Sequence, residues 1–134
     1  MTNIRHEEAL DAMFVLPPEL LEQFGPDDTH ERCAVLLGHR DRGKFVITDV
    51  VEVANDATDT TSTFAIKAGS IKRAVRKGRG VFLGVLHTHW ESTTYPSIND
   101  VQNIPRGWIG CVLHTKTRTI TYYTRSGYVT EVHP

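Results

Sequence analysis

The spacing of hydrophobic and polar residues along the chain predicts a series of strands separated by three short helices. Along 44–55, apolar residues such as Phe45 and Ile47 broadly alternate with polar ones, which is the period of a half-buried strand. The run 81–87 is apolar throughout, as in a strand that is covered on both faces at the centre of a sheet. Strands are predicted at 13–16, 32–40, 44–55, 81–87, 108–114, 118–124 and 128–133.

Helical features occur in three of the intervening segments. A first helix is predicted over 17–25, where two prolines open the segment and a glycine ends it. Ser97 is well placed as the N-cap of a short helix over 97–102. The remaining predicted helix, over 66–78, lies between these two along the chain. It carries basic residues on one face and apolar residues on the other, namely Ala68, Ile71, Ala74 and Val75.

This order of elements predicts an α/β fold: a single-domain mixed-sheet sandwich with helices packed on the sheet. The domain is assigned to 13–134, and 1–12 to a flexible N-terminal segment.

The turn at 41–43 ends in glycine and separates two strand-like runs, so it predicts a hairpin.

Composition and charge narrow the range of functions. The 134 residues carry a net charge of −1, which argues against a dedicated, strongly basic nucleic-acid binder. The N-terminus lacks the apolar core of a signal peptide, and no apolar run approaches the roughly 20 residues of a membrane helix. We therefore expect a soluble, cytoplasmic protein. Cys33 and Cys111 follow no metal-ligand spacing and are expected to be free, buried thiols.

The segment 84–100 carries the candidate chemistry. His87 and His89 are two residues apart at the end of a predicted strand, so both imidazoles point to the same face. Asp100 follows Ser97 by three residues, within the first turn of the short helix. Two histidines and one aspartate would provide three protein ligands for zinc and leave the fourth tetrahedral position to water. An open position of this kind is typical of a catalytic site.

The same segment resembles the JAMM zinc metalloprotease family, also called MPN+ or JAB. His-x-His is followed by seven residues and then by Ser-x-x-Asp, which is the family's motif. The segment "ERCAVLLG" at 31–38 resembles the strand that begins with the family's essential glutamate, so Glu31 is its counterpart. The resemblance covers about residues 13–130. It implies a JAB/MPN-like fold of compact prokaryotic type, with a layout like that of cytidine deaminase.

The resemblance also implies roles for these residues. His87, His89 and Asp100 would hold one zinc ion per chain, Glu31 would act as general base and then general acid, and Ser97 would donate a hydrogen bond to the oxyanion. Alternative interpretations stay open: Ser97 as an ordinary N-cap, Asp100 as a partner of the helix dipole, and Glu31 as an exposed acid.

One position departs from the family's pattern. Trp90 follows the second histidine, where the family usually has proline. The departure leaves the metal ligands unchanged and puts the choice of substrate in doubt. Trp90 and Tyr95 flank the predicted site and are candidate substrate-binding residues.

The resemblance implies hydrolysis of the amide bond after the C-terminal Gly-Gly of a ubiquitin-like or sulfur-carrier protein. Two alternatives remain: a catalytically inert MPN-type scaffold for protein interaction, and a metal hydrolase acting on small amides or cysteine adducts. No nucleic-acid or membrane partner is expected, and the oligomeric state is left open.

Overall fold

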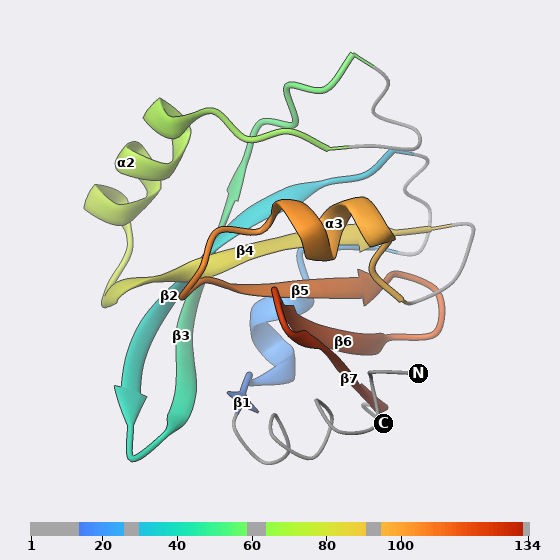
Figure 1. Ribbon diagram of the computed structural model, residues 1–134. Coiled ribbons are helices and arrows are strands. Elements are labelled where there is room, and N and C mark those ends of the chain that lie inside the picture. The colour runs from blue at the N-terminus through green and yellow to red at the C-terminus, as the bar shows by residue number, and fades with distance from the viewer. Residues whose placement is uncertain (1–13, 26–29, 59–63, 91–94, 133–134) are drawn as a thin grey trace.

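A mixed sheet of seven strands forms the centre of the structure, a computed structural model that describes residues 14–25, 30–58, 64–90 and 95–132 (Figure 1). The strand order across the sheet is β1-β3-β2-β4-β5-β6-β7; β1 with β3 and β4 with β5 are parallel, and the other neighbours are antiparallel. The strands are β1 Phe14–Val15, β2 Cys33–Asp41, β3 Lys44–Val53, β4 Val81–His89, β5 Ile109–His114, β6 Thr119–Thr124 and β7 Gly127–Val132.

Every predicted strand is present, and the mixed α/β single-domain fold is confirmed. The apolar run 81–87 becomes β4, the middle strand of the seven, as its lack of polar positions indicated. Arg42 and Gly43 form the turn of the β2–β3 hairpin with φ angles of 51° and 83°. Positive φ at both central residues is the geometry that suits a two-residue hairpin turn. The assigned N-terminal segment, 1–12, lies outside the described residues.

The first predicted helix is the main correction. Instead of a helix over 17–25, the chain forms only the 3-10 turn η1, Pro18–Leu21. The Arg118 guanidinium donates hydrogen bonds to the carbonyl oxygens of Leu21 (2.9 Å) and Phe24 (2.6 Å). The backbone bonds of this segment join residues three apart, as from the Phe24 N–H to the Leu21 carbonyl oxygen (3.0 Å), so they follow the 3-10 pattern, and Arg118 binds the carbonyls at its end.

Two helices, α2 Ala68–Lys77 and α3 Ile98–Asn103, pack on one face of the sheet, and α3 crosses in front of β4 and β5 (Figure 1). In α2, Ala74 is buried and both Ile71 and Val75 are half-buried, as predicted. Ala68 is exposed, contrary to its predicted place on the apolar face, because it begins the helix ahead of the turns that pack on the sheet.

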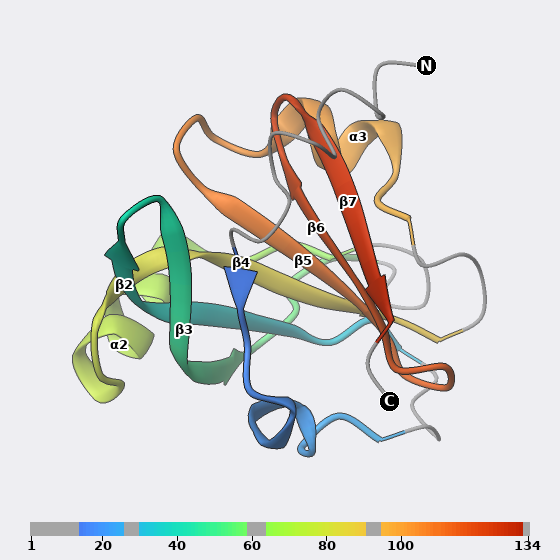
Figure 2. The same ribbon diagram turned by 90° about the horizontal axis from the view of Figure 1, so that it is seen from below.

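The hydrophobic core divides between the two faces of the sheet because side chains alternate along each strand. In β2, Ala34 and Leu36 join the cluster that covers η1, whereas Val35 and Leu37 pack under α2. The sheet is also twisted, and β5, β6 and β7 fan away from β4 (Figure 2). The candidate site lies on the face that carries α2 and α3, and its cavity is lined by residues of both helices.

Both cysteines are free and buried, as expected. Burial, helped by the charges of Glu31, Glu52 and Asp56, raises the pKa of the Cys33 thiol to about 12. The thiol is therefore protonated at neutral pH, and Cys33 is not a nucleophile. Within the described ranges, no helix is long and apolar enough to cross a membrane.

Gly84 of β4 provides a test of the central strand pairing. A Cβ atom added at Gly84 would lie 1.7 Å from the carbonyl oxygen of Ile109 in β5. We expect Gly84→Ala to lower the free energy of unfolding by about 1–3 kcal/mol or more, which is the usual cost of forcing extra atoms into a packed interior. Urea unfolding followed by circular dichroism measures this change. Gly25→Ala is the matched control, since no described residue has an atom within 4 Å of the added atom there, and an equal loss in both variants would contradict the prediction.

Candidate metal centre

The candidate site lies at the carboxyl end of β4. There β4 runs parallel to β5, and the chain passes from one strand to the other through α3. His87 is fully buried near the carboxyl end of β4, and His89, the last residue of the strand, is half-buried and lines the adjoining cavity.

The distances between the predicted ligands fit a zinc ion. The two Nε2 atoms of His87 and His89 are 3.2 Å apart, and Nε2 of His87 is 3.4 Å from Oδ2 of Asp100. Two ligand atoms that are each about 2.0–2.1 Å from a tetrahedral zinc ion lie about 3.4 Å from each other. The pairs His87–His89 and His87–Asp100 are therefore spaced as two ligands of one zinc ion would be. Their assignment as the ligands stays a prediction.

Glu31 lies beside the imidazole pair. One of its carboxylate oxygens lies within 4.8 Å of a ring nitrogen of each histidine, and the residue is only 8% exposed. The interpretation of Glu31 as an exposed acid is thus excluded. Two carboxylates, Glu31 and Asp100, flank the histidines, so either could contribute an oxygen ligand or a base.

The backbone of Glu31 is fixed by its neighbours on β2 and β4. The N–H of Arg32 donates to the hydroxyl of Thr88 (2.9 Å), and the N–H of Thr88 donates to the carbonyl oxygen of Arg32 (2.9 Å). Thr88 is the residue between the two histidines, so these bonds set the glutamate directly against the His-x-His motif. On the other side, the Asn55 amide donates to the carbonyl oxygen of Glu31 (2.7 Å).

Asn55 also organises the segment that covers His87. Its side-chain oxygen accepts hydrogen bonds from the backbone N–H groups of Ala57 (3.1 Å) and Ala65 (3.0 Å). Phe64, next to Ala65, stacks its ring on His87 with 4.1 Å between the centroids and 17° between the planes. In the part of the chain that the structure describes, Nδ1 of His87 has no hydrogen-bond partner. Stacking on Phe64 therefore helps to orient this imidazole, together with the contacts of its Nε2 atom with His89 and Asp100.

Ser97 and Asp100 form a reciprocal capping box at the start of α3. The Ser97 N–H donates to Oδ2 of Asp100 (2.8 Å), and the Asp100 N–H donates to the Ser97 hydroxyl oxygen (3.0 Å). Ser97 is thus an N-cap, as predicted, and its own hydroxyl proton can still be donated to a ligand. The same Oδ2 faces His87, so the cap also orients the candidate metal ligand.

The electrostatic surroundings keep Asp100 ionised. Burial would raise its pKa, but the hydrogen bond and charge of His87, together with the hydrogen bonds from Ser97, outweigh burial and lower the pKa. A metal ligand must be in this deprotonated form. Near Asp100, burial and that carboxylate's charge raise the pKa of Tyr123 far above its usual range, so its hydroxyl is neutral.

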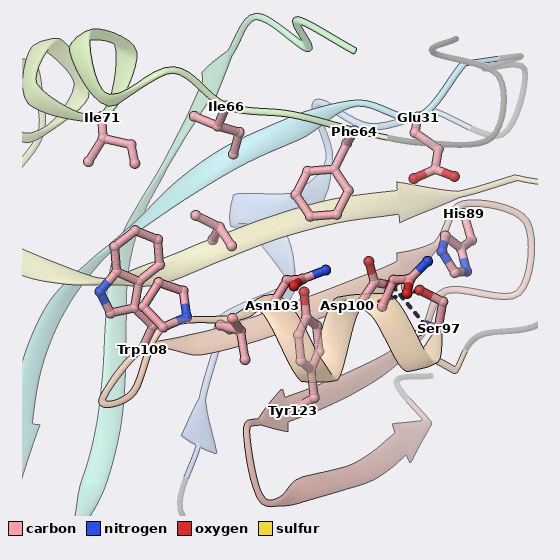
Figure 3. A pocket seen from close by; sticks show the side chains of 14 residues that line it. Glu31, Phe64, Ile66, Ile71, His89, Ser97, Asp100, Asn103, Trp108 and Tyr123 are labelled. Carbon is pink, nitrogen blue, oxygen red and sulfur yellow. Dashed lines mark hydrogen bonds between the residues drawn. The ribbon is translucent and has the colours of Figure 1, made fainter. Parts of the chain in front are cut away.

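A cavity of about 580 Å³ extends from the site along the sheet between α2 and α3 (Figure 3). Glu31, His89, Ser97 and Asp100 lie at one end, and Trp108 with Ile71 at the other (Figure 3). Its volume is within the range of about 300–1,000 Å³ that is usual for ligand sites. The lining residues are Glu31, Phe64, Ile66, Ile71, Val85, His89, Ser97, Asn99, Asp100, Asn103, Ile104, Pro105, Trp108 and Tyr123.

Glu31, His87 and His89 lie together as a group that could hold a metal ion, Asp100 contacts His87, and Ser97 caps the helix that carries Asp100. Trp90 is half-buried and Tyr95 is 49% exposed, and neither is among the described residues that line the cavity. Their proposed contact with substrate stays a prediction. Trp108 packs edge-to-face on Phe82 with 4.7 Å between the centroids and also lines the cavity.

Sequence reasoning missed the residues that support the site, Asn55 and Phe64. Both lie next to the polar segment 56–63, whose sequence shows no helical or strand period. A possible signal was an asparagine that directly follows a predicted strand, since asparagine side chains bond nearby backbone groups. No local pattern, however, links Phe64 to a histidine in another strand.

Metal binding tests the predicted ligands. We expect one zinc ion per chain after zinc repletion and complete loss of zinc in His89→Ala, because two remaining ligands hold zinc poorly. Metal analysis of the dialysed protein measures this. His39→Ala removes an exposed histidine of β2 and should retain zinc. Full zinc occupancy in His89→Ala would contradict the ligand assignment.

Comparison with known proteins identifies the family. A sequence model described as prokaryotic homologs of the JAB domain matches residues 18–125. The fold is similar to the solution structure of protein DSY2949 from Desulfitobacterium hafniense, with a TM-score of 0.71, 20% identity and 90% of each chain covered. It is also similar to the solution structure of a protein from Salinibacter ruber, with a TM-score of 0.57, 20% identity, and 88% of this chain and 90% of that chain covered. No curated protein matches the chain. Since the family model matches most of the sequence, this chain belongs to the prokaryotic homologs of the JAB domain.

Proposed function

We propose that this protein is a zinc-dependent hydrolase of amide bonds. Its substrate would be a ubiquitin-like or sulfur-carrier protein, cleaved after the C-terminal Gly-Gly. The observation that carries the proposal is the convergence of two histidines and two carboxylates at the end of a 580 Å³ cavity. The family, which includes metalloproteases, supports the same reaction class.

Each residue of the site has a chemical task in this reaction. Zinc, when bound by His87, His89 and Asp100, supplies a Lewis acid that makes water acidic enough to react at neutral pH. The Glu31 carboxylate accepts a proton from the attacking water and later delivers it to the leaving amine. The Ser97 hydroxyl donates a hydrogen bond to the oxygen of the tetrahedral intermediate. Burial of Glu31 and His87 keeps bulk water away from these proton transfers.

A metal hydrolase acting on small amides or cysteine adducts is the second candidate. It is supported by the cavity, whose volume suits a small molecule. Cleavage of a dipeptide-sized amide, with none of a protein that ends in Gly-Gly, would favour this candidate. An inert scaffold is supported less well, because it has no chemical need for an ionised aspartate beside two converging histidines.

A fusion protein tests the substrate class. We expect the zinc-loaded protein to cleave a fusion in which the Gly-Gly of a ubiquitin-like protein is followed by a short peptide, measured by mass spectrometry. Chelation should stop cleavage and zinc should restore it. Leucine in place of the penultimate glycine should abolish cleavage, because an extended glycine tail can approach the metal site closely by main-chain hydrogen bonds. Unaffected cleavage of the leucine fusion would exclude such a tail site.

Two substitutions test the assigned roles. Glu31→Gln should retain zinc and lose turnover, because an amide cannot accept the proton. Ser97→Ala should lower kcat by about 10²–10³-fold and leave residual activity, as expected when one oxyanion donor is removed. Steady-state kinetics and metal analysis of the same samples measure both effects. Normal turnover in Glu31→Gln would show that the mechanism is wrong.

A further inference from the structure

We propose that the cavity binds a large apolar side chain on the residue that follows the Gly-Gly pair, so that this enzyme releases an amine-side residue such as phenylalanine or leucine. The inference rests on the proposed function. It concerns the residue on the amine side of the scissile bond, which the Gly-Gly tail does not specify.

The walls of the cavity are apolar on two sides. Phe64 and Ile66 come from the segment before α2, and Ile71 comes from α2 itself. Trp108 closes the far end, and its ring is held against Phe82 of β4 by edge-to-face packing. Figure 3 shows these side chains in sequence from the metal site to the far end. An aromatic side chain buries about 150–250 Å² when it is enclosed, so its binding would remove both its own surface and the apolar cavity walls from water.

A Gly-Gly tail cannot fill this space, because glycine has no side chain. Glu31 and His89 lie at the polar end of the cavity, so the scissile amide must lie there and the apolar end must receive a neighbouring group. If the carbonyl side of the amide is glycine, the group comes from the amine side. The carboxamides of Asn99 and Asn103, one turn apart on α3, line the same cavity and can bond the main chain of that residue.

Kinetics with three substrates tests the inference. The substrates are fusions of one ubiquitin-like protein in which Gly-Gly is followed by Phe, is followed by Ala, or is joined to a lysine side chain. We expect kcat/KM to be about tenfold or more higher for Phe than for Ala, in line with the selectivity of apolar pockets. The lysine isopeptide should not exceed the Phe fusion. Equal kcat/KM for Phe and Ala, or a preference for the isopeptide, would overturn the inference.

Two variants locate the preference in the cavity. Ile66→Trp adds volume to the cavity wall and should remove the preference for Phe while the Ala fusion is still cleaved. Val81→Trp is the matched control, because Val81 is 60% exposed at the start of β4 and does not line the cavity. Should Ile66→Trp fail to fold, Trp108→Ala removes the far wall and should also reduce the preference. A preference for Phe that survives these changes would contradict the assignment.

A binding measurement separates this inference from the proposed reaction. Trp90→Phe leaves Trp108 as the only tryptophan, since the chain has two. In the metal-free form of this variant, acetyl-Gly-Gly-Phe amide should change the Trp108 fluorescence with at least tenfold tighter apparent Kd than acetyl-Gly-Gly-Ala amide. Selective binding without cleavage of any fusion would support the cavity and reject the reaction. Cleavage without selectivity, or no selective binding at all, would reject the cavity assignment.

Discussion

The pairing of β2 with β4 is the constraint on which the candidate site depends. Its antiparallel register places Cys33 opposite His87, and the two hydrogen bonds between Arg32 and Thr88 extend the pairing to the end of both strands. Glu31 directly precedes Arg32, and one of its carboxylate oxygens lies within 4.8 Å of a ring nitrogen of each histidine. A shift of one residue would turn the imidazoles to the other face of the sheet. The interior prevents such a shift, because Val35 and Leu36 are fully buried on opposite faces.

Several neighbouring interactions stabilise this arrangement without providing ligands. The Arg32 side chain holds both carboxylate oxygens of Glu52 in β3, at 2.7 and 2.5 Å, and lies over the ring of Phe24. Asn55 joins the carbonyl of Glu31 to the segment that brings Phe64 onto His87. The capping box of α3 orients Asp100 from the opposite side. The charged groups of the site are thus held in place by ordinary backbone and packing contacts, which limits the reorganisation that ligand binding requires.

In the proposed reaction, the cavity would provide this compact domain with a specificity element of its own. Only seven residues separate Asp100 from Trp108, so no long insertion is available there to hold a substrate. The space between α2 and α3 instead presents apolar side chains in line with the metal site. Recognition close to the scissile bond is consistent with a small domain, because each buried apolar group contributes to binding without a large interface.

Local sequence patterns determined most strands of this protein and part of its candidate site. The alternation along β3, the apolar run of β4, the two-residue spacing of His87 and His89, and the Ser97 cap all follow from periods that act over a few residues. Tertiary structure alone decided the remainder. The predicted helix over 17–25 is only one 3-10 turn, and the carbonyls at its end are bonded by Arg118, which is more than 90 residues away. The contact of Phe64 with His87 and the cavity between α2 and α3 likewise depend on non-local packing, which no local periodicity encodes.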